Sequence, residues 1–407
     1  MSGNFGPAQA ERDNLCSVDP IAAQGGVMLF PSHLTSGLTP LIIDPKDPGE
    51  HYAPWQELSK AAIDPNPFFG PEFLIPFLEN METPKVHLCV LKEAETGRWM
   101  MAAPVVRRRP GLAIPVTSLY ATEYGPLGVP LMQSDAGPQT TDAFLQLAAE
   151  QGGMPVVAMP YMPVEGTSAR ILSQSDHWHL ATSTPAERAA HDAGLLGEAQ
   201  FASAFSGKRR KELPRLMRRL AEQGEVKLAS VSGPQAVEQF EAFLELEEKG
   251  WKGKSGTALK SRPQTLTFAR AMIATRATRD GVRIDTLQVG GEAIALLVIL
   301  REGTKAFSWK IAYNEDFGKY SPGAQLALYA LERNLNDPDL TDGADSLAVP
   351  GHTMIEPLWN GRIRTATMLF ARSLPGRLLQ AGAKADIVTE QRLRRYARKY
   401  LKRGKNT

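Results

Sequence analysis

Hydrophobic and polar residues alternate along the segment Lys305–Tyr313, and the period changes directly after it. An alternation of aromatic or β-branched residues with small or charged ones predicts a strand with two different faces. A short loop follows, Pro322 suits the first turn of a helix, and leucines then recur at helical spacing to about Asn334. The first amides of a helix have no partner within it, so such a corner points free N–H groups at an anion.

The rest of the second half mixes the same two periods. Two apolar runs, Val282–Val289 and Ala293–Leu300, flank Gly290-Gly291, which predicts a hairpin. A short strand is expected at Ser346–Val349. The predicted order is strand, helix, helix, three strands, helix, strand and helix. The remaining expected elements are a strand at Glu225–Ser230, helices opened by Pro234 and Pro263, a helical segment from Glu356 and a strand at Thr365–Phe370.

A strongly basic helix is expected across residues 206–224. Ser206 is a suitable N-cap and Gly224 a suitable stop, whereas Pro214 should kink or break the helix. Its Lys and Arg residues fit either a solvated face or a contact with phosphate groups. The apolar residues between the charges are aliphatic, unlike the aromatic platforms that bind single-stranded nucleic acid.

The first half predicts a shorter set of elements after a largely irregular segment, residues 1–50. Helices should begin near His51 and at Pro71, and a hairpin, a long loop, a helix and a strand should follow. These four elements are expected at Val86–Val106, Tyr120–Met132, Thr141–Glu150 and Pro155–Met159. Residues 185–200 are expected to join the two halves.

Charge is unevenly spread along the 407 residues, a length that favours two domains. The net charge is +2, but residues 391–407 contain eight Lys or Arg and no acid, so the remaining chain carries −6. This tail has an apolar stripe with Leu393, Tyr396 and Leu401. It should form an amphipathic helix that packs on the body, with a peripheral membrane contact as the alternative.

Several classes of protein are excluded by composition. Two cysteines, Cys16 and Cys89, are too few for a disulfide framework or a cysteine-based zinc site. His177 and His179 share a strand face, but no third ligand is near, so no metal is expected. The N-terminus lacks a signal pattern, and the longest apolar run is too short to span a membrane. A cytoplasmic protein is expected, with the inner membrane face as the alternative location.

Two blocks carry a family resemblance: Gly250-Trp251-Lys252-Gly253 within LELEEKGWKGKSGTAL, and Ser321-Pro322-Gly323 within SWKIAYNEDFGKYSPGAQL. With the SGKRRKEL start at Ser206, they resemble the CelD-like acyltransferases, which are similar to the tandem-GNAT Fem peptidyltransferases. The resemblance covers roughly residues 60–370. It implies mixed α/β sheets in two tandem GNAT-like domains, at 51–190 and 191–385, followed by the basic helix 386–407.

The resemblance also implies a reaction, the transfer of an acyl group from acyl-CoA to an amine. The donor would bind where the fourth and fifth strands, Lys305–Tyr313 and Ser346–Val349, separate. The expected cofactor-binding residues are Lys310, Tyr320, Ser321, Gly323, Ala324 and Gln325. Tyr320 stands where the ordinary GNAT phosphate loop has Arg or Gln. Gln325 stands where that loop has Gly or Ala.

An amine nucleophile needs a base, since an alkyl ammonium has a pKa near ~10.4. His352 is the first candidate, because an imidazole titrates near ~6.5, and Glu356 is the second. Tyr313 is a candidate for protonating the leaving thiolate, and Lys252, like Lys310, for offsetting negative charge. The acyl or amine pocket would be walled by Trp251 and Trp309.

Two alternatives from other classes stay open. One is an aminoacyl-tRNA-dependent transferase that docks tRNA on the basic helix, although nucleic acid is not the expected partner. The other is a non-catalytic scaffold for polysaccharide assembly. The acceptor amine stays open, with an amino sugar of a polysaccharide precursor and a long-chain sphingoid-type amine as two candidate classes.

Overall fold

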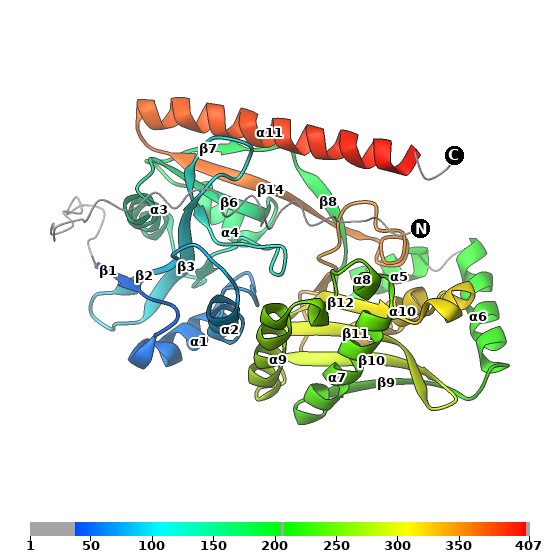
Figure 1. Ribbon diagram of the computed structural model, residues 1–407. Coiled ribbons are helices and arrows are strands. Elements are labelled where there is room, and N and C mark those ends of the chain that lie inside the picture. The colour runs from blue at the N-terminus through cyan, green and yellow to red at the C-terminus, as the bar shows by residue number, and fades with distance from the viewer. Residues whose placement is uncertain (1–36, 205–206, 404–407) are drawn as a thin grey trace.

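A computed structural model describes residues 37–204 and 207–403. Its strands form one long mixed sheet, seen across the molecule in Figure 1. The strands are β1 (Leu38–Ile43), β2 (His87–Glu93), β3 (Trp99–Arg108), β4 (Val116–Leu119), β5 (Leu131–Met132), β6 (Val156–Pro163), β7 (His179–Thr182), β8 (Ala186–His191), β9 (Val226–Ser232), β10 (Val282–Val289), β11 (Glu292–Glu302), β12 (Lys305–Tyr313), β13 (Ala344–Asp345) and β14 (Gly361–Ala371).

Helices cover both faces of this sheet (Figure 1). They are α1 (Tyr52–Ala61), α2 (Pro71–Asn80), α3 (Pro138–Gly152), α4 (Thr167–Leu172), α5 (Gly194–Ala204), α6 (Gly207–Ala221), α7 (Pro234–Lys249), α8 (Trp251–Lys254), α9 (Pro263–Ala277), α10 (Pro322–Leu335) and α11 (Leu374–Arg403). The starts of α2, α7, α9 and α10 each have proline in the first turn, where its missing N–H costs no helical hydrogen bond.

The sheet has two halves with the same internal arrangement. Its order is β1-β2-β3-β4-β6-β14-β8-β13-β12-β11-β10-β9. In each half four antiparallel strands end in one that runs parallel to its next neighbour, β4 beside β6 and β12 beside β13. A helix, α3 or α10, connects each parallel pair. The prediction of a mixed α/β fold with two related halves is confirmed.

The two halves exchange strands at the centre of the sheet. β14, from the end of the chain, pairs with β6 of the first half, whereas β8 of the first half pairs with β13 of the second. The last helix, α11, then returns over the first half and packs on β6, β7 and β14. Neither half is therefore complete without strands from the other.

The halves also share their core and a buried ion network. Aromatic rings of α2 meet Phe268 of α9, with the Phe73 and Phe77 ring centroids 5.3 and 5.1 Å away. Nearby, Arg276 and Glu302 form a fully buried ion pair with an N–O distance of 2.9 Å. Arg276 also donates to the carbonyl oxygen of Pro67 in the first half.

Several predicted elements need correction. β1 lies within a segment expected to be irregular, and β8 and α5 lie within the expected joining segment 185–200. Pro214 does not break α6, which is one helix from Gly207 to Ala221, although a proline there cannot donate to the Arg210 carbonyl. Ser206, its expected cap, lies outside the described residues. The C-terminal helix begins at Leu374 rather than at 386.

Two further corrections concern single elements of the second half. The segment Trp251–Lys254, whose glycine-rich sequence argues against a helix, is one short helix. Gly253 permits this turn, since a Cβ there would lie 1.7 Å from the carbonyl oxygen of Glu248. The helical segment expected from Glu356 to Trp359 consists of turns instead.

Candidate active site

The edge of β12 that faces β13 is open over most of its length. β12 pairs with β13 only at Ala306 and Phe307. On its other side, the register with β11 shifts between Lys310 and Ser308, so Trp309 is an extra residue, a β-bulge. Within residues 37–204 and 207–403, no strand pairs with this edge beyond the bulge. Bulges are common next to active sites because they bend a strand and redirect its groups.

The direction of the free backbone groups follows from two hydrogen bonds. The Asn314 N–H donates to Ile294 of β11, whereas the Ile311 carbonyl faces away from β11 and accepts from Lys252 Nζ at 2.9 Å. N–H and C=O groups of one residue in a strand point to the same side, and the side alternates. The N–H groups of Ile311 and Tyr313 therefore point into the opening between β12 and β13.

The fifth strand lies earlier than predicted. β13 consists of Ala344 and Asp345, and the expected strand Ser346–Val349 leaves the sheet. The cause is local: the Asp345 carboxylate accepts a hydrogen bond from the Leu347 N–H, and Leu347 has a φ of 53°. Such a left-handed conformation is strained for leucine and often accompanies a functional site. The turn widens the opening beside β12.

A buried carboxylate that the sequence analysis missed organises one wall of the opening. Glu247 in α7 is fully buried and bonds Lys252 Nζ at 2.8 Å and the Leu259 N–H at 2.8 Å. Burial raises its pKa, but Lys252 and Lys310 outweigh that effect and hold the pKa below its usual value. Glu247 falls in the apolar stripe with Phe240 and Leu244, a position where an acid signals a buried partner.

Lys310 lies above two aromatic rings at the bulge. Its Nζ is 5.3 Å from the centre of the Tyr124 ring and 5.6 Å from that of Trp309. Trp309 in turn donates from Nε1 to the Tyr124 carbonyl oxygen at 2.8 Å, which joins the loop of the first half to β12. Burial lowers the pKa of Lys310, while Glu247 opposes that change. The first half therefore supplies a wall of this site.

His352 lies in the loop between β13 and β14. Its Nδ1 is buried and has no hydrogen-bond partner among the described residues. Burial lowers the pKa of His352, Lys252 lowers it further, and Glu356 opposes both. The imidazole is therefore neutral at pH 7 and able to accept a proton. Glu356 is near, but its carboxylate lies 3.9 Å from the Arg362 guanidinium.

The corner before α10 is partly occupied by the protein itself. The expected free N–H of Ser321 donates instead to the Gly318 carbonyl, because the preceding turn closes on itself. Gly323 is buried, and a Cβ there would lie 2.5 Å from Met354 Sδ, in the loop that also carries His352. The anion site is thus reduced to the amides of Gly323 and Ala324, with Met354 over one of them.

The side chains of Tyr320 and Gln325 are buried near the same corner. Gln325 Nε2 donates to the Leu213 carbonyl of α6, 2.8 Å away, so it holds the basic helix against α10. Tyr320 lies beside Phe317 in the second-half core. The cofactor roles predicted for both side chains remain predictions.

The outer face of α6 is cationic. Its exposed residues Arg210, Lys211, Arg215, Arg218 and Arg219 have no ion pair with any described acid. The two remaining predicted residues flank the opening: Tyr313 is half-buried at the end of β12, and the Trp251 N–H donates to Glu315 at 2.8 Å.

The matching opening in the first half is closed by its own loop. β4 pairs with β6 only at Thr117 and Ser118. Beyond them the loop presses on β6 so closely that a Cβ on Gly128 would lie 2.0 Å from the Pro160 carbonyl oxygen. Asn66 fixes this loop by donating to the carbonyls of Leu127 and Val129. The second half thus has an unpaired edge on β12, and the loop of the first half contacts that strand through Tyr124.

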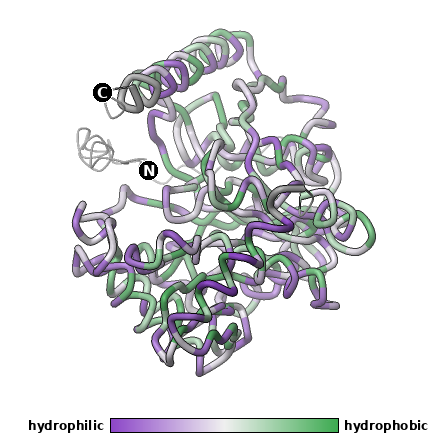
Figure 2. The backbone as a smooth tube through the Cα atoms, turned by 90° about the vertical axis from the view of Figure 1, so that its right-hand side faces the viewer, coloured by the Kyte–Doolittle hydropathy of each residue, from purple (hydrophilic) through white to green (hydrophobic). Residues whose placement is uncertain are grey.

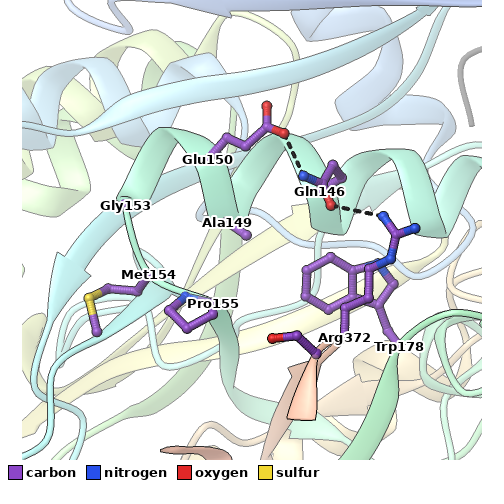
Figure 3. A pocket seen from close by; sticks show the side chains of 9 residues that line it. Gln146, Ala149, Glu150, Gly153, Met154, Pro155, Trp178 and Arg372 are labelled. Atoms are coloured by element: carbon purple, nitrogen blue, oxygen red, sulfur yellow. Dashed lines mark hydrogen bonds between the residues drawn. The ribbon is translucent and has the colours of Figure 1, made fainter. Parts of the chain in front are cut away.

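A hollow of about 640 Å³ lies in the first half, between the end of α3 and the end of β14 (Figure 3). Trp178 and Arg372 line it, and Arg372 donates to Gln146 at 3.4 Å. None of the predicted site residues lines it. Among the described residues no cluster of three or more His, Cys, Asp or Glu is arranged to hold a metal ion.

The unpaired edge of β12 lies within a segment that matches a known domain family. Residues 207–340 match the acetyltransferase (GNAT) domain family. The matched segment includes α6, the Lys252 turn, the bulge at Trp309 and the corner at Gly323, whereas His352 lies outside it. Membership of the CelD-like family remains a prediction.

Solved structures and curated sequences add little beyond the fold. A FemX structure is 8% identical, with 82% of this chain and 98% of that chain covered and a TM-score of 0.49. L-PGS from Bacillus licheniformis is 13% identical, with 83% of this chain and 96% of that chain covered and a TM-score of 0.45. A tandem GNAT protein of clavulanic acid biosynthesis is 14% identical, with 83% of this chain and 99% of that chain covered and a TM-score of 0.35. Such low values carry no information on substrate, and no curated protein sequence matches the chain.

Proposed function

We propose that this chain is an N-acyltransferase that moves an acyl group from a coenzyme A thioester to a primary amine. The observation that carries the proposal is the open edge of β12 beyond the Trp309 bulge, inside a segment that matches the GNAT domain family. An unpaired strand edge binds an extended ligand through main-chain hydrogen bonds. The amide groups of a pantetheine arm suit such an edge.

The donor would be held at three places. The N–H groups of Ile311 and Tyr313 would bond the pantetheine arm and the thioester carbonyl, and the amides of Gly323 and Ala324 would meet the pyrophosphate. The cations on the outer face of α6 would then face the remaining phosphate. Each backbone donor to a developing oxyanion is worth on the order of 3 kcal/mol in the transition state.

The acyl transfer would proceed by direct attack. The neutral amine nitrogen forms a C–N bond to the thioester carbon, its proton passes to the unpartnered Nδ1 of His352, and the C–S bond breaks. The leaving thiolate takes a proton from the Tyr313 hydroxyl or from water. Lys252 and Lys310 would stabilise negative charge near the cleft, and Glu247 would keep Lys252 in place.

The acceptor would enter from the side of the first half. The Tyr124 and Trp309 rings wall this side, and Trp251 flanks it. Amino sugars of polysaccharide precursors and long-chain sphingoid-type amines are the two acceptor classes to compare.

A thermal-shift and mass-spectrometric screen against acyl-CoA thioesters of graded chain length tests the proposal. We expect stabilisation by at least one thioester, and an acylated amine product from one acceptor class. If no thioester or free coenzyme A raises the melting temperature, the proposal is wrong.

An aminoacyl-tRNA-dependent transferase is the second candidate, favoured by two observations. The α6 face carries five exposed cations, and the Ser321 amide and Met354 restrict the pyrophosphate corner. This candidate predicts tRNA binding that weakens steeply with salt, without coenzyme A binding. A protein that binds neither ligand would fit the third alternative, a non-catalytic scaffold.

A further inference from the structure

Helix α11 has one face that anchors it and another whose side chains are largely exposed. On its inner face Ala383 and Ile387 are buried against β4, β6 and β14, and Gln380 donates to the Leu369 carbonyl at 2.6 Å. On its outer face Leu374, Leu378 and Tyr396 are 73%, 70% and 63% exposed. Figure 2 shows the helix along one end of the molecule, with hydrophobic and hydrophilic residues interleaved.

Five exposed apolar residues share one stripe of the helix; the exposed Arg392 interrupts this stripe, and Leu393, 54% exposed, lies to one side of it. Leu374, Leu378, Ala381, Ala385 and Tyr396 recur at spacings of three, four and eleven residues, which place them on one stripe of an α-helix. All five are exposed. Exposed apolar side chains that share one face of a helix mark an interaction site more often than single scattered ones do.

The charges beside this stripe have one sign. Arg377, Lys384 and Arg395 are exposed and form a row along one flank of the stripe. The two described acids of α11 are half-buried and engaged elsewhere: Asp386 accepts from the Ala113 and Ile114 amides, and Glu390 pairs with Arg394. Among residues 374–397 no exposed side chain is therefore acidic.

We infer that the outer face of α11 binds an anionic lipid surface. Apolar side chains enter the interface while flanking Arg and Lys side chains reach the headgroups, the arrangement of helices that lie in the plane of a membrane. A second copy of the chain is a poor occupant, since two such faces would bring like charges together. No described helix is long and apolar enough to cross a bilayer, so this contact would be peripheral.

Vesicle flotation of the full chain tests the inference. Wild type should float with phosphatidylglycerol-containing vesicles and not with phosphatidylcholine vesicles, and salt should weaken the binding. The triple variant Leu374→Ser, Leu378→Ser, Tyr396→Ser should lose at least tenfold in affinity. Since these side chains are exposed, its melting temperature should equal that of wild type.

Matched control variants separate binding through α11 from nonspecific hydrophobic or electrostatic binding elsewhere on the protein. Leu195→Ser, Leu196→Ser removes two exposed leucines from α5, of which Leu195 is 85% exposed, and should bind as wild type. Arg377→Gln, Lys384→Gln, Arg395→Gln should weaken binding by roughly 100-fold. Arg215→Gln, Arg218→Gln, Arg219→Gln in α6 has the same net charge and should change binding far less.

The inference is overturned if wild type does not bind anionic vesicles, or if the control variants lose as much binding as the α11 variants. A dimer in light scattering that the leucine and tyrosine substitutions dissociate, without vesicle binding, would assign the face to a second copy instead. Neither result bears on acyl-CoA binding, which is measured separately.

Discussion

His352 is the residue on which the proposed proton transfer depends. Its unpartnered, buried Nδ1 and lowered pKa indicate a neutral imidazole at pH 7. We expect His352→Ala to lower kcat by roughly 100- to 10,000-fold. Because only the neutral form accepts a proton, the wild-type rate should fall at acid pH, through a pKa below the ordinary value of ~6.5.

The matched variant for this test is Glu356→Gln, which removes the other candidate base. We expect it to keep the acid limb of the pH–rate profile and to move it slightly toward lower pH, since Glu356 raises the pKa of His352. Loss of the limb in Glu356→Gln, with retention in His352→Ala, would reverse the two assignments.

Glu247 is the residue that holds Lys252 against β12. Glu247→Gln leaves the amine without its buried partner, so we expect a loss of about 1–3 kcal/mol in stability at pH 7. The folded pKa of Glu247 is lowered, so its contribution is present above the unfolded pKa of about 4.3 and is lost as the pH falls through the folded pKa. The melting temperatures of variant and wild type should therefore converge in acid.

Its neighbour Glu245 supplies the control. Glu245 pairs with Lys260 at the surface, where an ion pair is worth about 0–1 kcal/mol, so Glu245→Gln should cost little. Equal losses in both variants at pH 7 would show that burial of Glu247 does not matter.

Gly323 and Met354 form a pair that tests the anion corner. A Cβ at Gly323 would meet Met354 Sδ at 2.5 Å, so Met354→Ala should make room and tighten coenzyme A binding. Gly323→Ala should weaken that binding, and the double variant should recover part of the loss. Isothermal titration calorimetry measures all three, and coenzyme A affinities unchanged throughout would remove this corner from the binding site.

At the scale of elements, local patterns predicted those parts whose neighbours are near in sequence. The alternation around Trp309 gave β12 with its observed bounds, and Gly290-Gly291, both at positive φ, gave the hairpin between β10 and β11. β8 was missed because its sequence, AERAAH, has no alternating pattern. It is a strand because β13 and β14, far along the chain, pair with both of its edges.

The same distinction applies to the candidate site. Lys252 and Trp309 could be named from the sequence because they lie in the two blocks that carry the family resemblance, and His352 because it follows a predicted strand. Tyr124 could not be placed at β12, since its contact with Trp309 joins residues 185 positions apart. The Met354 side chain over Gly323 was equally hidden, because the loop that carries it has no regular period.

The contact between α9, β11 and the first half should dominate stability. Arg276 and Glu302 are fully buried and reach Pro67 and Ser59 across the boundary. Removing one partner of a buried pair leaves an unpaired charge, so Arg276→Met should cost about 3–5 kcal/mol. Arg270→Met, which breaks the exposed pair with Glu241, should cost under about 1 kcal/mol. Thermal unfolding compares them, and equal shifts would contradict this ranking.

At the scale of the whole molecule, the two halves share a strand arrangement but differ in how the edge beside the parallel strand pair is covered. In the first half the loop around Gly128 lies against β6, and the Tyr124 carbonyl of the same loop accepts a hydrogen bond from Trp309 in β12 of the second half. Since the halves also exchange β8 and β14, residues 1–204 expressed alone should not fold, because β6 then keeps only its short pairing with β4 and loses β14. A cooperative thermal transition from that fragment would contradict the shared architecture.

Hydrogen–deuterium exchange with and without an acyl-CoA thioester tests the central claim most directly. Donor binding along β12 predicts slower exchange of the amides of Ile311 and Tyr313, together with those of Gly323 and Ala324. If only other segments are protected, or if no segment is protected at saturating thioester, the unpaired edge of β12 is not the acyl-donor site.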